Sequence, residues 1–245
     1  MIVTRSLRTR GYELDHEGLI APVALLRYLE HLRWEALSAD ELPSLFQGGR
    51  SVVIVSQRLR LLKDLSMGQD LRAQLWIGAV GRTSLTFHHL LHRGEELTAA
   101  ASVTAVHLNG EGRPTPLPGE IRSWVREEVI PDLPPPLEGE PPPGAWIWPV
   151  EVRPSDTDLL RHVNHASYGA YVEDARYWGA RRGAYGEDPR ARARLRGISL
   201  VYRQQALAGE ALDVVTWPQE GAFAFAIRRR GEEGALCRVR VEVAP

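Results

Sequence analysis

The sequence predicts an α+β protein built from two copies of one unit, each with an antiparallel sheet wrapped around a single long helix. Three observations lead to this prediction: an internal repeat with a constant offset, one helical pattern followed by several strand patterns in each half, and a proline-rich segment between the halves. Two such units in one chain would form an intrachain pseudo-dimer, in place of the two-fold dimer that a single unit would otherwise form.

The internal repeat rests on identical residues at a fixed separation. Besides the four residue pairs given at the end of this paragraph, two longer matches support the repeat. The stretches 68–76 and 209–217 both begin with glycine and end with tryptophan, and the letters RGEE occur at 93–96 and again at 230–233. Ordered matches of this kind indicate a duplication. Four identical pairs lie 143 positions apart: Arg10 and Arg153, Asp15 and Asp158, Glu30 and Glu173, Arg33 and Arg176.

Proline runs in residues 131–145 favour an extended polyproline II conformation and cannot continue a helix or a central strand. We therefore expect an N-terminal domain at residues 1–130, a proline-rich linker at 131–145, and a C-terminal domain at 146–245 that carries the active site.

Each half contains one predicted helix. The first is expected to begin at Pro22, because proline at the first helical position sacrifices no hydrogen bond. The second is expected to begin near Asn164 or His165. Extended runs of alternating character follow each helix and predict about five strands per unit. The predicted apolar faces consist of Leu25, Leu26, Leu29 and Leu32 in the first helix and Tyr168, Tyr171, Val172 and Ala175 in the second.

Composition restricts the class of partner. A formal net charge of −1 gives no basic surface of the kind that binds a nucleic-acid backbone, so we expect no nucleic acid. No long apolar segment is present, so we expect neither export nor membrane insertion, but a cytoplasmic protein. Cys237 is the single cysteine, which excludes an intrachain disulfide, and strand alternation predicts that it is buried.

The polar side chains that carry chemistry gather before the second helix. Asp158 is followed within seven positions by His162, Asn164 and His165. A helix cap is the alternative explanation for an aspartate or asparagine here, but a cap does not call for two histidines as well.

The first copy has apolar residues, Leu19, Ala21 and Pro22, at the equivalent positions, and of the cluster keeps only Asp15. We therefore expect Asp15 to be a structural cap, with one competent site per chain.

The stretch 155–176, with an aspartate in a turn, the letters HVN, a tyrosine and a Glu-x-x-Arg on the helix, resembles hotdog-fold thioesterases of the 4-hydroxybenzoyl-CoA thioesterase type. The tandem layout resembles the acyl-acyl-carrier-protein thioesterases, which are two hotdog folds fused in one chain. The resemblance implies a tandem hotdog fold, acyl thioester hydrolysis, an acyl-CoA or acyl carrier protein substrate, and no cofactor.

The site departs from the acyl-carrier-protein thioesterase pattern at two positions. Leu160 stands where that pattern has an asparagine, and Gln205 lies where it places a later glutamate or cysteine. His165 matches the histidine of single-hotdog acyl-CoA thioesterases instead. Gln205, Glu173 and Asp15 are secondary site candidates. The alternative for Glu173 is that it forms a solvated ion pair with Arg176.

Thioester hydrolysis needs a base or nucleophile at the carbonyl carbon and donors aimed at the carbonyl oxygen. Asp158 would act as base or nucleophile, while first-turn N–H groups and the helix dipole polarise the carbonyl. His162, Asn164 and His165 would orient the aspartate or water and protonate the departing thiolate.

Two other clusters have simpler explanations. His88 and His92 share a strand face, with His89 opposite, but without clear partner ligands we expect no metal there. The arginine-rich loop 186–197 is close in sequence to the second helix, and we expect an ordinary solvated loop, with phosphate or acidic-carrier binding as the alternative.

We therefore expect an acyl-ACP or acyl-CoA thioesterase, with a non-catalytic acyl-thioester-binding or sensing protein as the alternative. A further homodimer of pseudo-dimers stays open.

Overall fold

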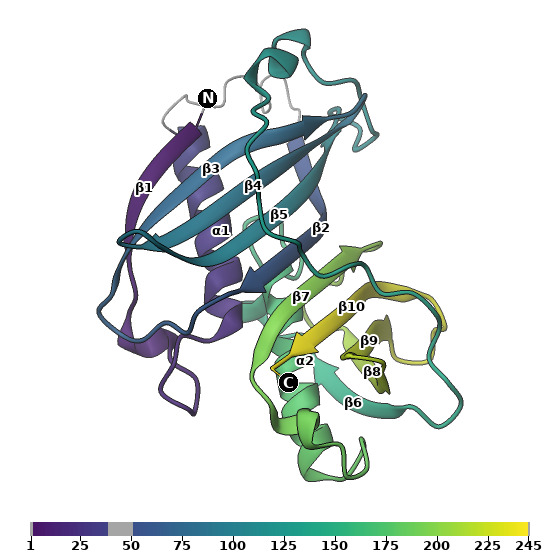
Figure 1. Cartoon of the computed structure of the whole chain (residues 1–245). Coiled ribbons are helices and arrows are strands. Elements are labelled where there is room, and N and C mark those ends of the chain that lie inside the picture. Colours follow the sequence, from purple (N-terminus) through teal and green to yellow (C-terminus); the bar gives the residue numbers. More distant parts are fainter. Residues whose placement is uncertain (1, 39–50, 245) are drawn as a thin grey trace. The chain divides into compact units, whose positions relative to one another are not determined.

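The computed structural model describes residues 2–38 and 51–244. The chain divides into two compact units, Met1–Leu133 and Pro134–Pro245, which are called unit 1 and unit 2 below. Figure 1 shows unit 1 from purple to teal and unit 2 from teal to yellow. The division falls inside the segment expected to be a linker, and residues from Pro134 onward group with unit 2.

Unit 1 is an antiparallel sheet with one long helix (Figure 1). The strand order is β1-β3-β4-β5-β2, and every neighbouring pair is antiparallel. The elements are β1 (Ile2–Arg8), α1 (Pro22–Ser38), β2 (Ser51–Leu61), β3 (Asp70–Val80), β4 (Ser84–Arg93) and β5 (Glu96–Leu108).

Unit 2 repeats this topology. Its strand order is β6-β8-β9-β10-β7, which matches the order of unit 1 when strands are compared in sequence order. The predicted duplication is therefore visible in the sheets themselves. The elements are β6 (Trp146–Glu151), α2 (His165–Arg181), β7 (Leu195–Tyr202), β8 (Ala211–Gln219), β9 (Ala222–Arg229) and β10 (Ala235–Val243).

Both helices begin where the sequence predicted and bury the predicted faces. Helix α1 starts at Pro22, and α2 starts at His165 with Asn164 as its N-cap. Burying one leucine side chain contributes about 2 kcal/mol, so each helix is held mainly by this apolar face. The buried residues include Leu25, Leu26, Leu29 and Leu32 of α1 and Tyr168, Tyr171, Val172 and Ala175 of α2.

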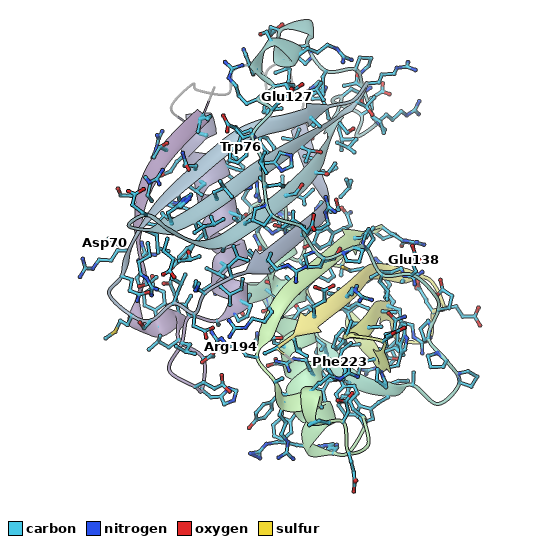
Figure 2. The ribbon with its side chains drawn as sticks, viewed as in Figure 1. Asp70, Trp76, Glu127, Glu138, Arg194 and Phe223 are labelled. Atoms are coloured by element: carbon cyan, nitrogen blue, oxygen red, sulfur yellow. The ribbon has the colours of Figure 1, made fainter. Side chains whose placement is uncertain are left out.

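The core of unit 2 also includes aromatic packing between the sheet and the chain that follows α2. Phe223, labelled in Figure 2, is fully buried on β9, and its ring centroid lies 4.8 Å from that of Tyr185. The Tyr185 hydroxyl lies 3.0 Å from the Thr216 hydroxyl on the neighbouring strand β8. Burial raises the pKa of Tyr185 to about 12, so this phenol stays protonated at neutral pH.

The segment 134–145 packs on unit 2. Leu137 is buried in a cluster with residues of β8 and β9. These strand residues alternate along the chain with Thr216 and Phe225, so the cluster lies on the sheet face opposite to Thr216 and Phe225. The Arg238 guanidinium donates to the Gly139 carbonyl. The other members of the cluster are Val215, Trp217, Ala224 and Ala226.

Candidate functional site

A tight turn precedes helix α2 and contains the central candidate, Asp158. The Asp158 N–H donates to the His162 carbonyl over 3.0 Å, and the Arg161 N–H donates to the Asp158 carbonyl over 2.9 Å. The side chain closes the turn, because Asp158 Oδ1 accepts from the Leu160 N–H at 2.9 Å. This aspartate therefore sits in a turn with one carboxylate oxygen fixed by the backbone.

Unit 1 has the same turn before helix α1. The Asp15 N–H donates to the Leu19 carbonyl over 2.7 Å, and Asp15 Oδ1 accepts from the N–H groups of Glu17 at 2.9 Å and Leu19 at 3.2 Å. Asp15 and Asp158 thus share a structural task. Closing this turn is therefore common to both aspartates and does not by itself indicate a catalytic role for Asp158.

The histidines and the asparagine follow Asp158 at the entrance of α2. Asn164 caps the helix, because its Oδ1 accepts from the Ala166 N–H at 2.9 Å. The Ala166 N–H is therefore not free to donate to a substrate carbonyl oxygen, which leaves fewer first-turn N–H groups for that purpose than the sequence predicted. His165 is the first helical residue, and its carbonyl accepts from the Tyr202 hydroxyl at 2.8 Å. Asn164 is therefore the N-cap of α2.

The loop after β7 lies beside this entrance. The Val163 N–H donates to the Ala206 carbonyl over 2.9 Å, and His162 forms an isolated antiparallel bridge with Leu207. Gln205 in this loop is exposed, and its carbonyl accepts from Arg229 at 2.7 Å. The fold thus places the Gln205 loop next to His162, although 43 positions separate the two residues.

A buried ionic brace supports the turn, and sequence reasoning missed it. Asp156 is 6% exposed and accepts from Arg153 and from the Tyr171 hydroxyl, the latter at 2.8 Å. Burial raises the pKa of Asp156, but the hydrogen bonds from Arg153 and Tyr171 outweigh burial and hold the pKa below its ordinary value. The Asp156 carbonyl also accepts from the Asn164 N–H at 2.8 Å, which ties the brace to the helix cap.

Unit 1 contains the equivalent brace. The Tyr28 hydroxyl donates to Glu13, which also accepts from the Arg10 N–H at 2.8 Å. Glu13 and Asp156 have the same 143-residue offset as the other repeat pairs, and so do Tyr28 and Tyr171. A search for chemically similar pairs at this offset would have found the brace.

Glu173 lies apart from the turn. It is eight residues into α2 from His165, which corresponds to about 12 Å along the axis. Its carboxylate pairs with Arg176 at 3.4 Å, and because the Arg176 side chain is only 12% exposed, this ion pair is not the solvated one that was expected. Arg176 in turn donates to the carbonyls of Ala191 and Ala193, and thereby fastens the arginine-rich loop to the helix.

The remaining histidines lie in unit 1. His89 is completely buried, whereas His88 and His92 are partly exposed on the other face of β4. Over residues 2–38 and 51–244, no three side chains of the metal-binding types are grouped. Cys237 is buried as predicted, and burial raises the pKa of its thiol.

Comparisons with known proteins agree with this architecture. A sequence model of the thioesterase-like superfamily matches residues 10–125. An acyl-ACP thioesterase structure from Bacteroides thetaiotaomicron has a TM-score of 0.83 at 17% identity, and the alignment covers 99% of this chain and 98% of that one. The chain is a tandem hotdog protein, and its first unit matches the thioesterase-like superfamily. The predicted fold class is thereby confirmed.

Two further known proteins are similar to this tandem hotdog protein. A chloroplastic acyl-acyl carrier protein thioesterase of Arabidopsis thaliana is 27% identical over 124 residues, which are 48% of this chain and 64% of the relative. The match thus spans slightly less than two thirds of that relative. The 12:0-ACP thioesterase of Umbellularia californica has a TM-score of 0.79 at 18% identity, with 100% of this chain and 97% of that one covered.

No helix in the described part of the chain has both the length and the apolar character needed to cross a membrane.

Proposed function

We propose that this tandem hotdog protein hydrolyses an acyl thioester of acyl carrier protein or coenzyme A to the free acid and the thiol. The observation that carries the proposal is the Asp158 turn, which joins a fixed carboxylate to two histidines at the start of α2 within a thioesterase-like fold. The named relatives are acyl-ACP thioesterases, which supports the substrate class.

The geometry of Asp158 suits a base or a nucleophile. Its Oδ1 is held by the Leu160 N–H, while Oδ2 accepts no hydrogen bond from any residue that the structure describes. One oxygen is therefore oriented and the other is available to a water molecule or to the substrate. The side chain is half-buried, so a reacting group can reach it.

The reaction has two forms that differ in the role of Asp158. As a base, the carboxylate takes a proton from water, whose oxygen attacks the thioester carbon; the carbon–sulfur bond breaks, and the thiolate takes up the proton. As a nucleophile, the carboxylate attacks the carbon itself and expels the thiolate, and water then hydrolyses the resulting anhydride. Both forms leave an acid and a thiol.

His162 and His165 are the proposed polar partners. The His162 ring makes no hydrogen bond to another described residue, so it is free to orient the water or to donate to the leaving thiolate. The start of α2 adds the positive end of the helix dipole, which favours charge on the carbonyl oxygen. Asn164 serves this arrangement mainly as the cap that holds the helix start in place.

Unit 1 is proposed to carry no second site. Leu19, Ala21 and Pro22 occupy the positions of His162, Asn164 and His165 and offer no side-chain donor or base. Asp15 Oδ1 accepts two backbone N–H groups, as a structural turn residue does.

Thiol release from acyl-CoA and acyl carrier protein substrates of several chain lengths tests the proposal. We expect turnover by the wild-type protein and a loss of at least 100-fold in Asp158→Asn, because asparagine can still accept the Leu160 N–H but has no charge. Tight binding of acyl thioesters without thiol release would instead support the binding or sensing function.

A further inference from the structure

The two equivalent turns differ at their tips. In unit 2 the tip bears Leu159, which is 76% exposed, and Leu160, which is 49% exposed. Unit 1 has His16 and Glu17 at these positions. A polar tip is what a solvated turn normally carries, so two exposed leucines beside a polar cluster call for an apolar contact. On the neighbouring loop, Leu207 is 43% exposed, and its backbone forms a bridge with that of His162.

Arg161 completes this tip. It has a φ of 63° and is the single non-glycine residue with positive φ in the described ranges. Its counterpart in unit 1 is Gly18, with a φ of 77°, which adopts this conformation without strain. Unit 2 thus has a strained arginine where the same backbone accepts glycine freely. Its guanidinium pairs with no carboxylate and contacts no ring in the described part of the chain.

We propose that this tip binds the phosphopantetheine arm that coenzyme A and acyl carrier protein share, with Arg161 on the phosphate and Leu159, Leu160 and Leu207 on the neighbouring gem-dimethyl group. The arm places a phosphate one methylene away from a carbon with two methyl groups, so it combines the anion and the apolar surface that the tip would recognise. The inference rests on the proposed function, because it assumes an acyl thioester at Asp158.

The arginine-rich loop is a weaker candidate for the same phosphate. Arg190 there forms an ion pair with Asp188 at 2.7 Å, and the loop is fastened to α2 through Arg176. Arg192 is exposed in that loop and serves as the matched control for a general charge effect.

Binding of two non-hydrolysable thioether analogues, an acyl-phosphopantetheine and the same acyl-pantetheine without its phosphate, tests the proposal by calorimetry. Arg161→Gly should weaken the phosphorylated analogue about tenfold and leave the other unchanged, because only the first carries the anion. Arg161→Lys should retain part of the affinity. Arg161→Gly should also melt at the wild-type temperature or higher, since glycine relieves the strain.

Arg192→Ala should leave both affinities unchanged, and Leu159→Ser should weaken both analogues equally. Equal effects of Arg161→Gly on the two analogues, or no effect on either, would overturn the proposal. The turnover of Arg161→Gly is then compared with acyl-CoA and with acyl carrier protein substrates. A KM increase with both carriers supports binding of the phosphate that they share. A KM increase with acyl carrier protein alone points to acidic side chains of the carrier and contradicts the proposal. Because the analogues are not hydrolysed, the binding result is independent of whether the protein is a thioesterase.

Discussion

Replacement of Tyr171 by phenylalanine removes one hydroxyl from the buried brace without changing the shape of the core. That hydroxyl donates to Asp156 at 2.8 Å, and the carboxylate is 6% exposed. Hydrogen bonds to charged groups contribute about 1.5–3 kcal/mol. Asp156 retains its bonds from Arg153, whose side chain is 71% exposed, so we expect a loss near the lower end, about 1.5 kcal/mol in the free energy of unfolding.

Tyr28→Phe is the matched control, because Tyr28 donates to Glu13 in the equivalent brace. We expect the two variants to lose similar amounts of stability in urea unfolding at pH 7. Their activities should differ, since the Asp156 carbonyl also holds the Asn164 N–H at the entrance of α2. Tyr171→Phe should lower kcat several-fold, and Tyr28→Phe should leave kcat unchanged.

The pH dependence supplies a second readout for Tyr171→Phe. The pKa of Asp156 lies below its ordinary value of 3.8 in the folded state, so the carboxylate stabilises the fold above that pH and this contribution is lost as the pH falls through the folded-state pKa. The difference between wild type and Tyr171→Phe should therefore shrink below pH 3.8. An activity loss in Tyr28→Phe equal to that in Tyr171→Phe, or no stability loss in either, would refute the reasoning.

Two further predictions concern stability. Burial lowers the pKa of His89, so below about pH 6.5 the unfolded state binds more protons than the folded state, and the free energy of unfolding falls as the pH decreases. Thermal unfolding between pH 8 and pH 5.5 should show this slope, and His89→Leu should remove most of it. An unchanged slope in His89→Leu would exclude His89 as the cause. Leu137→Ala should lower the free energy of unfolding in urea by about 2 kcal/mol, because it removes part of the cluster on β8 and β9. A loss below about 0.5 kcal/mol, which is typical of an exposed position, would show that the segment 134–145 does not pack there in solution.

The helices and their buried faces could be predicted from sequence because the signals are local. Pro22 and Asn164 mark the helix starts, and Leu25 and Leu29 lie on one face by helical spacing alone. The 143-residue repeat predicted the shared topology before any strand pairing was known. These features depend on neighbours along the chain or on direct comparison of the two halves.

The parts of the site that were missed depend on contacts between distant residues or on backbone conformation. Asp156 and Tyr171 are 15 positions apart, and no local pattern shows that one donates to the other. The positive φ of Arg161 was hidden because arginine rarely adopts it, although Gly18 at the same place in the repeat was a visible signal.

The central claim is that the chemistry belongs to unit 2 and to Asp158, although Asp15 sits in the same turn. Thiol release by Asp158→Asn and Asp15→Asn, measured side by side with one acyl thioester and with matched thermal unfolding, tests this most directly. We predict that Asp158→Asn loses at least 100-fold in kcat/KM while Asp15→Asn retains wild-type activity, because only Asp158 is followed by His162 and His165. Equal losses in the two variants, or a loss confined to Asp15→Asn, would contradict the account.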